Sequence, residues 1–186
     1  MNEVLNEEAT GDHIEAATAS TSPVVGAILG TALNAASRRG SAPDVVHGLI
    51  AGLRLLRTAV EQEAGYAMAA AVDSAIRTRL LVDNLSKLRS SGIEPDSIPL
   101  PTPGPEASAT TAIFENAAKS CLAVNAHAED NTPLEQALFA FTSQLLQELG
   151  GAPAWTDLMR ELRLSAGGQR AVAMAILPSD GAATVH

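Results

Sequence analysis

The fold class follows from residues 42–60, which read APDVVHGLIAGLRLLRTAV. Apolar side chains recur in this stretch at steps of three and four residues: Val46, Leu49, Ile50, Leu53, Leu56 and Val60. This spacing places them on one side of an α-helix. Pro43 suits the first turn of that helix because proline has no amide hydrogen to leave unpaired. The stretch therefore predicts an amphipathic helix with Leu53 in the core.

Composition extends the helical prediction to the rest of the chain. Ala supplies 35 of the 186 residues and aromatic residues only 3%. This bias favours the best helix former over the residues typical of strands. A second apolar stripe, which includes Leu145, follows Thr132-Pro133. We therefore expect an all-α bundle of five or six Ala-rich helices. Because each buried Ala removes little apolar area from water, self-association would add to so thin a core.

The chain divides into five expected segments. Residues 1–22 carry five acidic and no basic residues, which predicts a disordered acidic tail. Residues 23–92 form an N-terminal helical segment with a basic excess, and residues 106–177 a C-terminal helical segment with an acidic excess. The Pro-rich residues 93–105 read as a connector between them, because each proline removes a backbone donor. Residues 178–186 are expected to fray.

Gly65 interrupts the helical pattern of residues 43–91. A glycine inside a helix costs about 1 kcal/mol relative to Ala, which is too little to decide the outcome. One bent helix and two separate helices both remain open.

The charge pattern narrows the kind of partner. Residues 38–90 carry eight basic and five acidic residues, whereas residues 91–155 carry one basic and eight acidic ones. Part of the basic excess lies on one predicted helix and gives a candidate partner-contact face: Arg77, Arg79, Lys87 and Arg89. The net charge of −9 and the scarcity of aromatic residues argue against autonomous nucleic-acid binding.

Two pairs of glycines have small-xxx-small spacing inside predicted helices: Gly26 with Gly30, and Gly48 with Gly52. A glycine is unfavourable in a helix unless a neighbouring backbone needs the room. Both pairs therefore predict close helix packing. The crossing can be within one chain or between two chains, and the sequence leaves both open.

The sequence gives little sign of catalytic or metal chemistry. Its single cysteine, Cys121, excludes an internal disulfide and a cysteine-based zinc site. Asp44 and His47 share a helix face, but metal sites in helical bundles need further ligands from other helices. A phosphate-binding loop and a nucleophile elbow are both absent from the sequence. We assign no catalytic residue, metal site or cofactor.

The function expected from these features is a non-catalytic helical adaptor or assembly subunit that contacts another protein or itself, with a homo-oligomer favoured. The alternative is a helical subunit of a nucleoprotein complex that contacts phosphate through the basic face. An enzyme with no recognisable motif comes third. The acidic N-terminus and lack of a long apolar run predict a cytoplasmic protein without a membrane partner. Ten Arg against two Lys suggest a bacterial source.

Overall fold

The computed structural model describes residues 22–91, 98–151 and 153–163, and the side chains within these ranges except those of residues 80–91. The expected tail up to residue 21, residues 92–97 of the connector and the segments after residue 163 lie outside this part of the chain.

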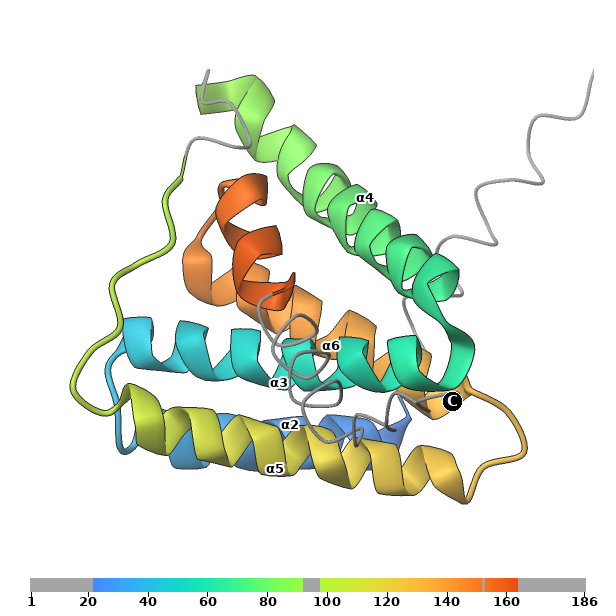
Figure 1. The fold of residues 1–186 in the computed structure, drawn as a ribbon. Coiled ribbons are helices and arrows are strands. Elements are labelled where there is room, and N and C mark those ends of the chain that lie inside the picture. Colours follow the sequence, from blue (N-terminus) through green and yellow to red (C-terminus); the bar gives the residue numbers. More distant parts are fainter. Residues whose placement is uncertain (1–21, 92–97, 152, 164–186) are drawn as a thin grey trace, which may run out of the picture. The chain divides into compact units, whose positions relative to one another are not determined.

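The all-α prediction is confirmed. The helices are α2 (Pro23–Ser37), α3 (Ala42–Ala64), α4 (Tyr66–Ser91), α5 (Ala107–Ala126) and α6 (Thr132–Leu149), followed by a helical stretch over residues 155–163 (Figure 1). Across the described ranges, the β pairing is limited to an isolated bridge between Ile98 and Pro153. None of the described helices is both long and apolar enough to span a membrane.

Local chemistry sets the ends of these helices. Pro23 lies in the first turn of α2 and Pro133 in that of α6. α6 ends at Gly150, whose φ of 64° is left-handed. Gly65 has a φ of 84°, which separates α3 from α4 and favours glycine. Residues 43–91 therefore form two helices.

The chain forms two compact units, and the boundary falls inside α3, between Leu56 and Arg57. The first unit lies within Met1–Leu56 and Pro101–Gly150, and the second within Arg57–Leu100 and Gly151–His186. Each unit thus takes residues from both the N-terminal and the C-terminal half. The boundary between the units therefore does not coincide with the connector.

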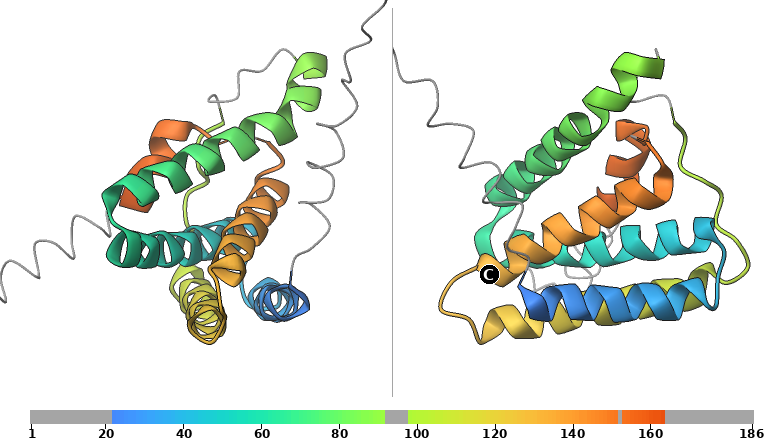
Figure 2. Two further views of the ribbon diagram at one scale, coloured as in Figure 1. Left: turned by 90° about the vertical axis from the view of Figure 1, so that its right-hand side faces the viewer. Right: turned by 180° about the vertical axis from the view of Figure 1, so that it is seen from behind.

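In the first unit, α2, α5 and α6 contact one another, and the first part of α3 packs against α5 and α6 (Figures 1 and 2). At the centre, the rings of Phe114 and Phe141 meet edge to face, with centroids 6.3 Å apart. Leu53 and Leu145 are fully buried, as predicted. The apolar stripes of four helices therefore share one core.

The second unit contains the end of α3, α4 and the helical stretch 155–163. Its buried apolar residues are Val60, Ala69, Ile76, Leu158, Met159 and Leu162. The backbone N–H of Ala154 donates to the carbonyl of Ile98 at 2.6 Å, so the middle of the connector is bonded to the chain just before residue 155.

Candidate interaction surfaces

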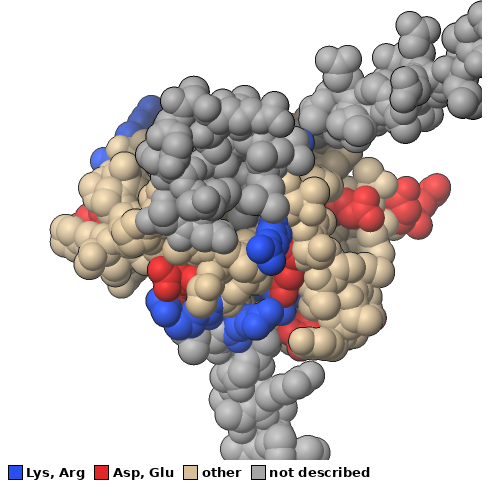
Figure 3. All heavy atoms as spheres, turned by 90° about the horizontal axis from the view of Figure 1, so that it is seen from above, with Lys and Arg blue, Asp and Glu red and all other residues tan. Residues whose placement is uncertain are grey.

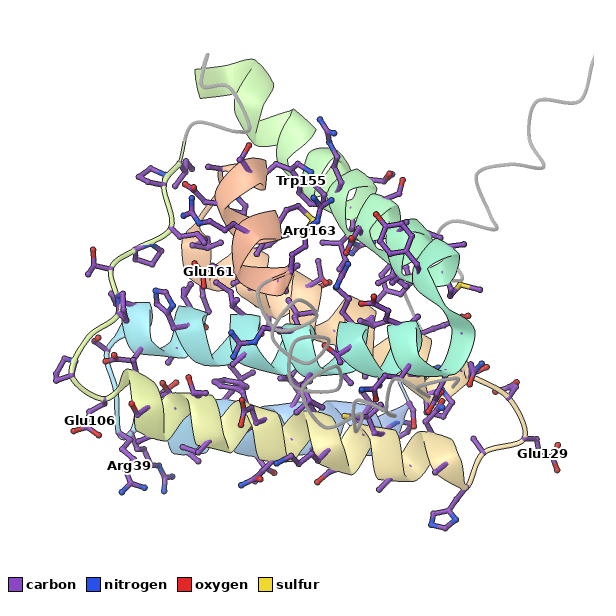
Figure 4. The ribbon with its side chains drawn as sticks, viewed as in Figure 1. Arg39, Glu106, Glu129, Trp155, Glu161 and Arg163 are labelled. Carbon is purple, nitrogen blue, oxygen red and sulfur yellow. The ribbon has the colours of Figure 1, made fainter. Side chains whose placement is uncertain are left out.

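The predicted basic face of α4 is not a single surface. Arg77 and Arg79 are two residues apart in a continuous helix, so they lie about 200° apart around its axis. The guanidinium of exposed Arg77 lies 5.6 Å from the ring centroid of Trp155, a cation–π contact (Figure 4). Arg79 is half-buried and also has an interaction. The side chains of Lys87 and Arg89 lie outside the described part.

Opposite charges also mix on the surface. Several of the basic side chains visible in Figure 3 lie beside acidic ones. Arg160 in the stretch 155–163 pairs with Asp157 at 3.0 Å. Contact with a partner through Arg77, Arg79, Lys87 and Arg89 stays a prediction, although a spacing of two residues does not repeat with the turn of a helix.

Asp44 and His47 have structural partners at the start of α3. One carboxylate oxygen of Asp44 accepts bonds from the backbone N–H of Ser41 at 2.9 Å and from its hydroxyl at 2.7 Å. The Ser41 hydroxyl lowers the pKa of Asp44 below its ordinary value, and the Ser41 N–H acts in the same direction. The ring of His47 is hydrogen-bonded to the Pro101 carbonyl at 2.7 Å. Among the described residues, no three potential ligands come close enough to hold a metal ion.

Ser41 and Asp44 have the spacing of a capping box, so the sequence contains a local signal for this role of Asp44. The same carboxylate also lies against the end of the connector, at Gly104. A Cβ at Gly104 would lie 2.6 Å from an oxygen of Asp44. Asp44 therefore acts as a buried support for the α2–α3 turn and for the chain that leads into α5.

Gly48 and Gly52 lie at the close approach of α3 to α5 and α6. A Cβ at Gly48 would collide with the ring of Phe114 and come within 2.9 Å of the Thr110 carbonyl. A Cβ at Gly52 would collide with the ring of Phe141. This pair makes room for the two core aromatic rings within one chain.

Gly26 and Gly30 behave differently, because a Cβ at either position would meet nothing within 4 Å. Both glycines lie outside the buried side of α2, which is formed by Val25, Leu29, Ala32 and Ala36. Within the described structure, the expected close packing at Gly26 and Gly30 is not found.

The side of α2 that faces away from the core is free of charge. We call it the outward side of α2 and define it by Val24, Gly26, Ala27, Gly30, Thr31, Asn34 and Ala35. The whole helix, Pro23–Ser37, contains no Asp, Glu, Lys or Arg. Val24 is 50% exposed. The hydroxyl of Thr31 donates to the Ala27 carbonyl at 2.8 Å, and the Asn34 amide donates to the Gly30 carbonyl at 3.1 Å. The Thr31 hydroxyl and one N–H of the Asn34 amide are thus bonded to their own helix.

Cys121 is a packing residue of the first unit. It is fully buried on α5, and burial raises the pKa of its thiol to about 11. A thiol held neutral in this way is a poor nucleophile at neutral pH.

The second unit contains a buried ion pair that the sequence pattern did not reveal. Arg57 on α3 donates to the carboxylate of Asp73 on α4 through Nε at 2.7 Å and Nη2 at 3.1 Å. The two residues are only 3% and 7% exposed. The Asp73 carboxylate raises the pKa of Arg57 above its ordinary value. A separation of 16 residues gave no local signal for this pairing.

No protein family, curated protein sequence or solved structure matches the chain. The surfaces are therefore interpreted from their own chemistry.

Proposed function

We propose that this chain is a non-catalytic assembly subunit or adaptor that works by contact with another protein chain through the outward side of α2. The observation that carries the proposal is the absence of charge along 15 residues of a partly exposed helix in a chain of net charge −9.

A surface helix ordinarily carries charged or polar residues on its solvent side. Charged residues are depleted at the centres of protein–protein interfaces, because their desolvation is costly there. The outward side of α2 has this composition. Since Thr31 and Asn34 bond to their own helix, a partner could cover them without leaving these two donors unpaired. Protein contact is therefore the use that this surface supports best.

The two other functions have less support. Contact with phosphate required a shared basic face on α4, and Arg77 and Arg79 do not share one. Catalysis would need a free nucleophile or base. Cys121 is held neutral, while Asp44 and His47 are hydrogen-bonded within the fold.

Site-specific photo-crosslinking in cells tests the proposal. A photoreactive residue in place of Ala27, on the outward side of α2, should give one discrete protein adduct. The matched control is Ala112, an exposed alanine on α5. The adduct from position 27 should disappear when Thr31→Glu introduces a charge beside it. Equal crosslinking from both positions, or none from position 27, would contradict the proposal.

A further inference from the structure

We infer that a second copy of this chain covers the outward side of α2, with the two α2 helices packed antiparallel about a two-fold axis. The inference rests on the proposed function and names its partner.

The two glycine pairs have different surroundings within the chain. Gly48 and Gly52 each have an aromatic ring where a Cβ would be, whereas no atom of the described residues lies within 4 Å of a Cβ at Gly26 or Gly30. A glycine without such a contact destabilises its helix, and no close packing within the monomer compensates for this cost. A second helix seated over Gly26 and Gly30 would come close to the α2 backbone. Their placement therefore fits a contact outside the single chain.

The exposed charges near the two ends of α2 differ in sign. At its C-terminal end, Arg38 and Arg39 are both exposed. One exposed acidic residue, Glu106, lies at this end of the first unit (Figure 4). Asp44 is also near, but it is buried and bonded to Ser41. The exposed charges at this end are thus mainly positive.

The exposed charges near the N-terminal end of α2 are acidic. The backbone N–H of Ser22 donates to the Gln136 side chain at 2.9 Å, which places this end beside the first turn of α6. The exposed residues in that turn and just before it include Glu129, Asp130 and Glu135.

The charges at the two ends of α2 favour a second copy of this chain as the partner and an antiparallel arrangement of the two helices. A parallel pair of α2 helices would bring two arginine ends together and two acidic ends together. An antiparallel pair brings each arginine end against an acidic end, twice, and also opposes the helix dipoles. The same surface then contacts itself about a two-fold axis, the commonest symmetry of homodimers. Between the ends, the charge-free surface meets its own copy without repulsion.

The size of the contact sets its strength. A helix of 15 residues is about 22 Å long and about 10 Å wide. One such pair buries less than the roughly 800 Å² per partner of a standard stable interface. We therefore expect a reversible dimer with a dissociation constant in the micromolar range or weaker, visible by sedimentation as the concentration rises.

Cysteine pairing of the full-length protein tests both the partner and its direction. Antiparallel packing centred on the glycines brings position 23 of one copy near position 34 of the other, because both positions lie on the same flank of Gly26 and Gly30. A mixture of Pro23→Cys and Asn34→Cys proteins should therefore form the mixed disulfide in excess of either self-paired product. The wild type, whose Cys121 is buried, is the control and should form no disulfide under the same conditions.

Charge exchange provides an independent test that does not disturb the core. Arg38→Glu with Arg39→Glu should weaken dimerisation at least tenfold at low salt. Glu129→Lys with Glu135→Lys should do the same. When the two double variants are mixed, each reversed end meets a complementary one, so heterodimers should recover. As a matched control, Arg163→Glu, an exposed site in the second unit, should leave dimerisation unchanged.

Each outcome decides the inference. Mixed disulfides together with recovery on charge exchange support it. Self-paired Pro23→Cys as the main product overturns the antiparallel arrangement. A chain that stays monomeric at all concentrations and salt levels overturns self-contact. If the crosslink from position 27 joins a different protein, the second copy is excluded and the proposed function stands. If position 27 gives no adduct at all, both fail.

Discussion

Replacing Gly48 with Ala tests how closely α3 approaches α5, and Gly30→Ala provides a matched reference. Both positions lie inside helices, so both substitutions gain the same helix propensity, about 1 kcal/mol. The two sites differ in their surroundings. A Cβ at Gly30 meets nothing within 4 Å, whereas one at Gly48 meets the Phe114 ring and the Thr110 carbonyl, 2.9 Å away.

The clash at Gly48 has no easy relief. Phe114 and Thr110 are both fully buried, and the carbonyl belongs to the α5 backbone. Overpacking of this kind costs about 1–3 kcal/mol. Because the propensity gain is common to both variants, Gly48→Ala should be about 1–3 kcal/mol less stable than Gly30→Ala. For a domain of this size, each kcal/mol shifts the melting temperature by about 2–4 °C.

Urea denaturation followed by circular dichroism measures this difference, at a protein concentration low enough to keep both variants monomeric. Gly30→Ala should unfold at a higher urea concentration than the wild type, and Gly48→Ala at a lower one than Gly30→Ala. If the two midpoints coincide, α3 does not approach α5 as closely as the structure has it, and the role given to Gly48 is wrong.

Three further predictions concern the cores and the buried groups. Leu53→Ala and Leu145→Ala should each lower the free energy of unfolding by about 2–5 kcal/mol, measured by urea denaturation, and a loss below about 0.5 kcal/mol at both sites would mean that the buried helix faces are misassigned. Asp73→Ala should cost about 3 kcal/mol, at the lower end for a broken buried pair, because Glu61 stays 3.6 Å from Arg57. The double variant Arg57→Met with Asp73→Leu should recover most of that loss in the same assay, and no recovery would refute a purely structural role for the pair. Since burial raises the Cys121 pKa from 9.0 to about 11, the thiol's contribution to stability should be constant below pH 9 and fall between pH 9 and 11. Cys121→Ala should remove this component of the pH dependence, and rapid alkylation of the native thiol at neutral pH would contradict its burial.

The sequence by itself determined the helices and most of their ends. Apolar spacing at three and four residues, with Pro43 and Pro133 in first turns and Gly150 after a last turn, predicts α3 and α6 within a few residues. The burial of Leu53 and Leu145 followed from the same spacing. These rules succeed because capping and side-chain periodicity depend on residues no more than about four positions apart.

Only the tertiary structure decided which surfaces are covered. Gly26–Gly30 and Gly48–Gly52 have the same spacing, yet the first pair has no neighbour among the described residues where a Cβ would be, and the second meets Phe114 and Phe141. Arg57 pairs with Asp73 only because α4 brings the two residues together across 16 positions of sequence. Whether one side of a helix is buried depends on helices that are distant in sequence. A local sequence pattern does not determine which of those helices pack against it.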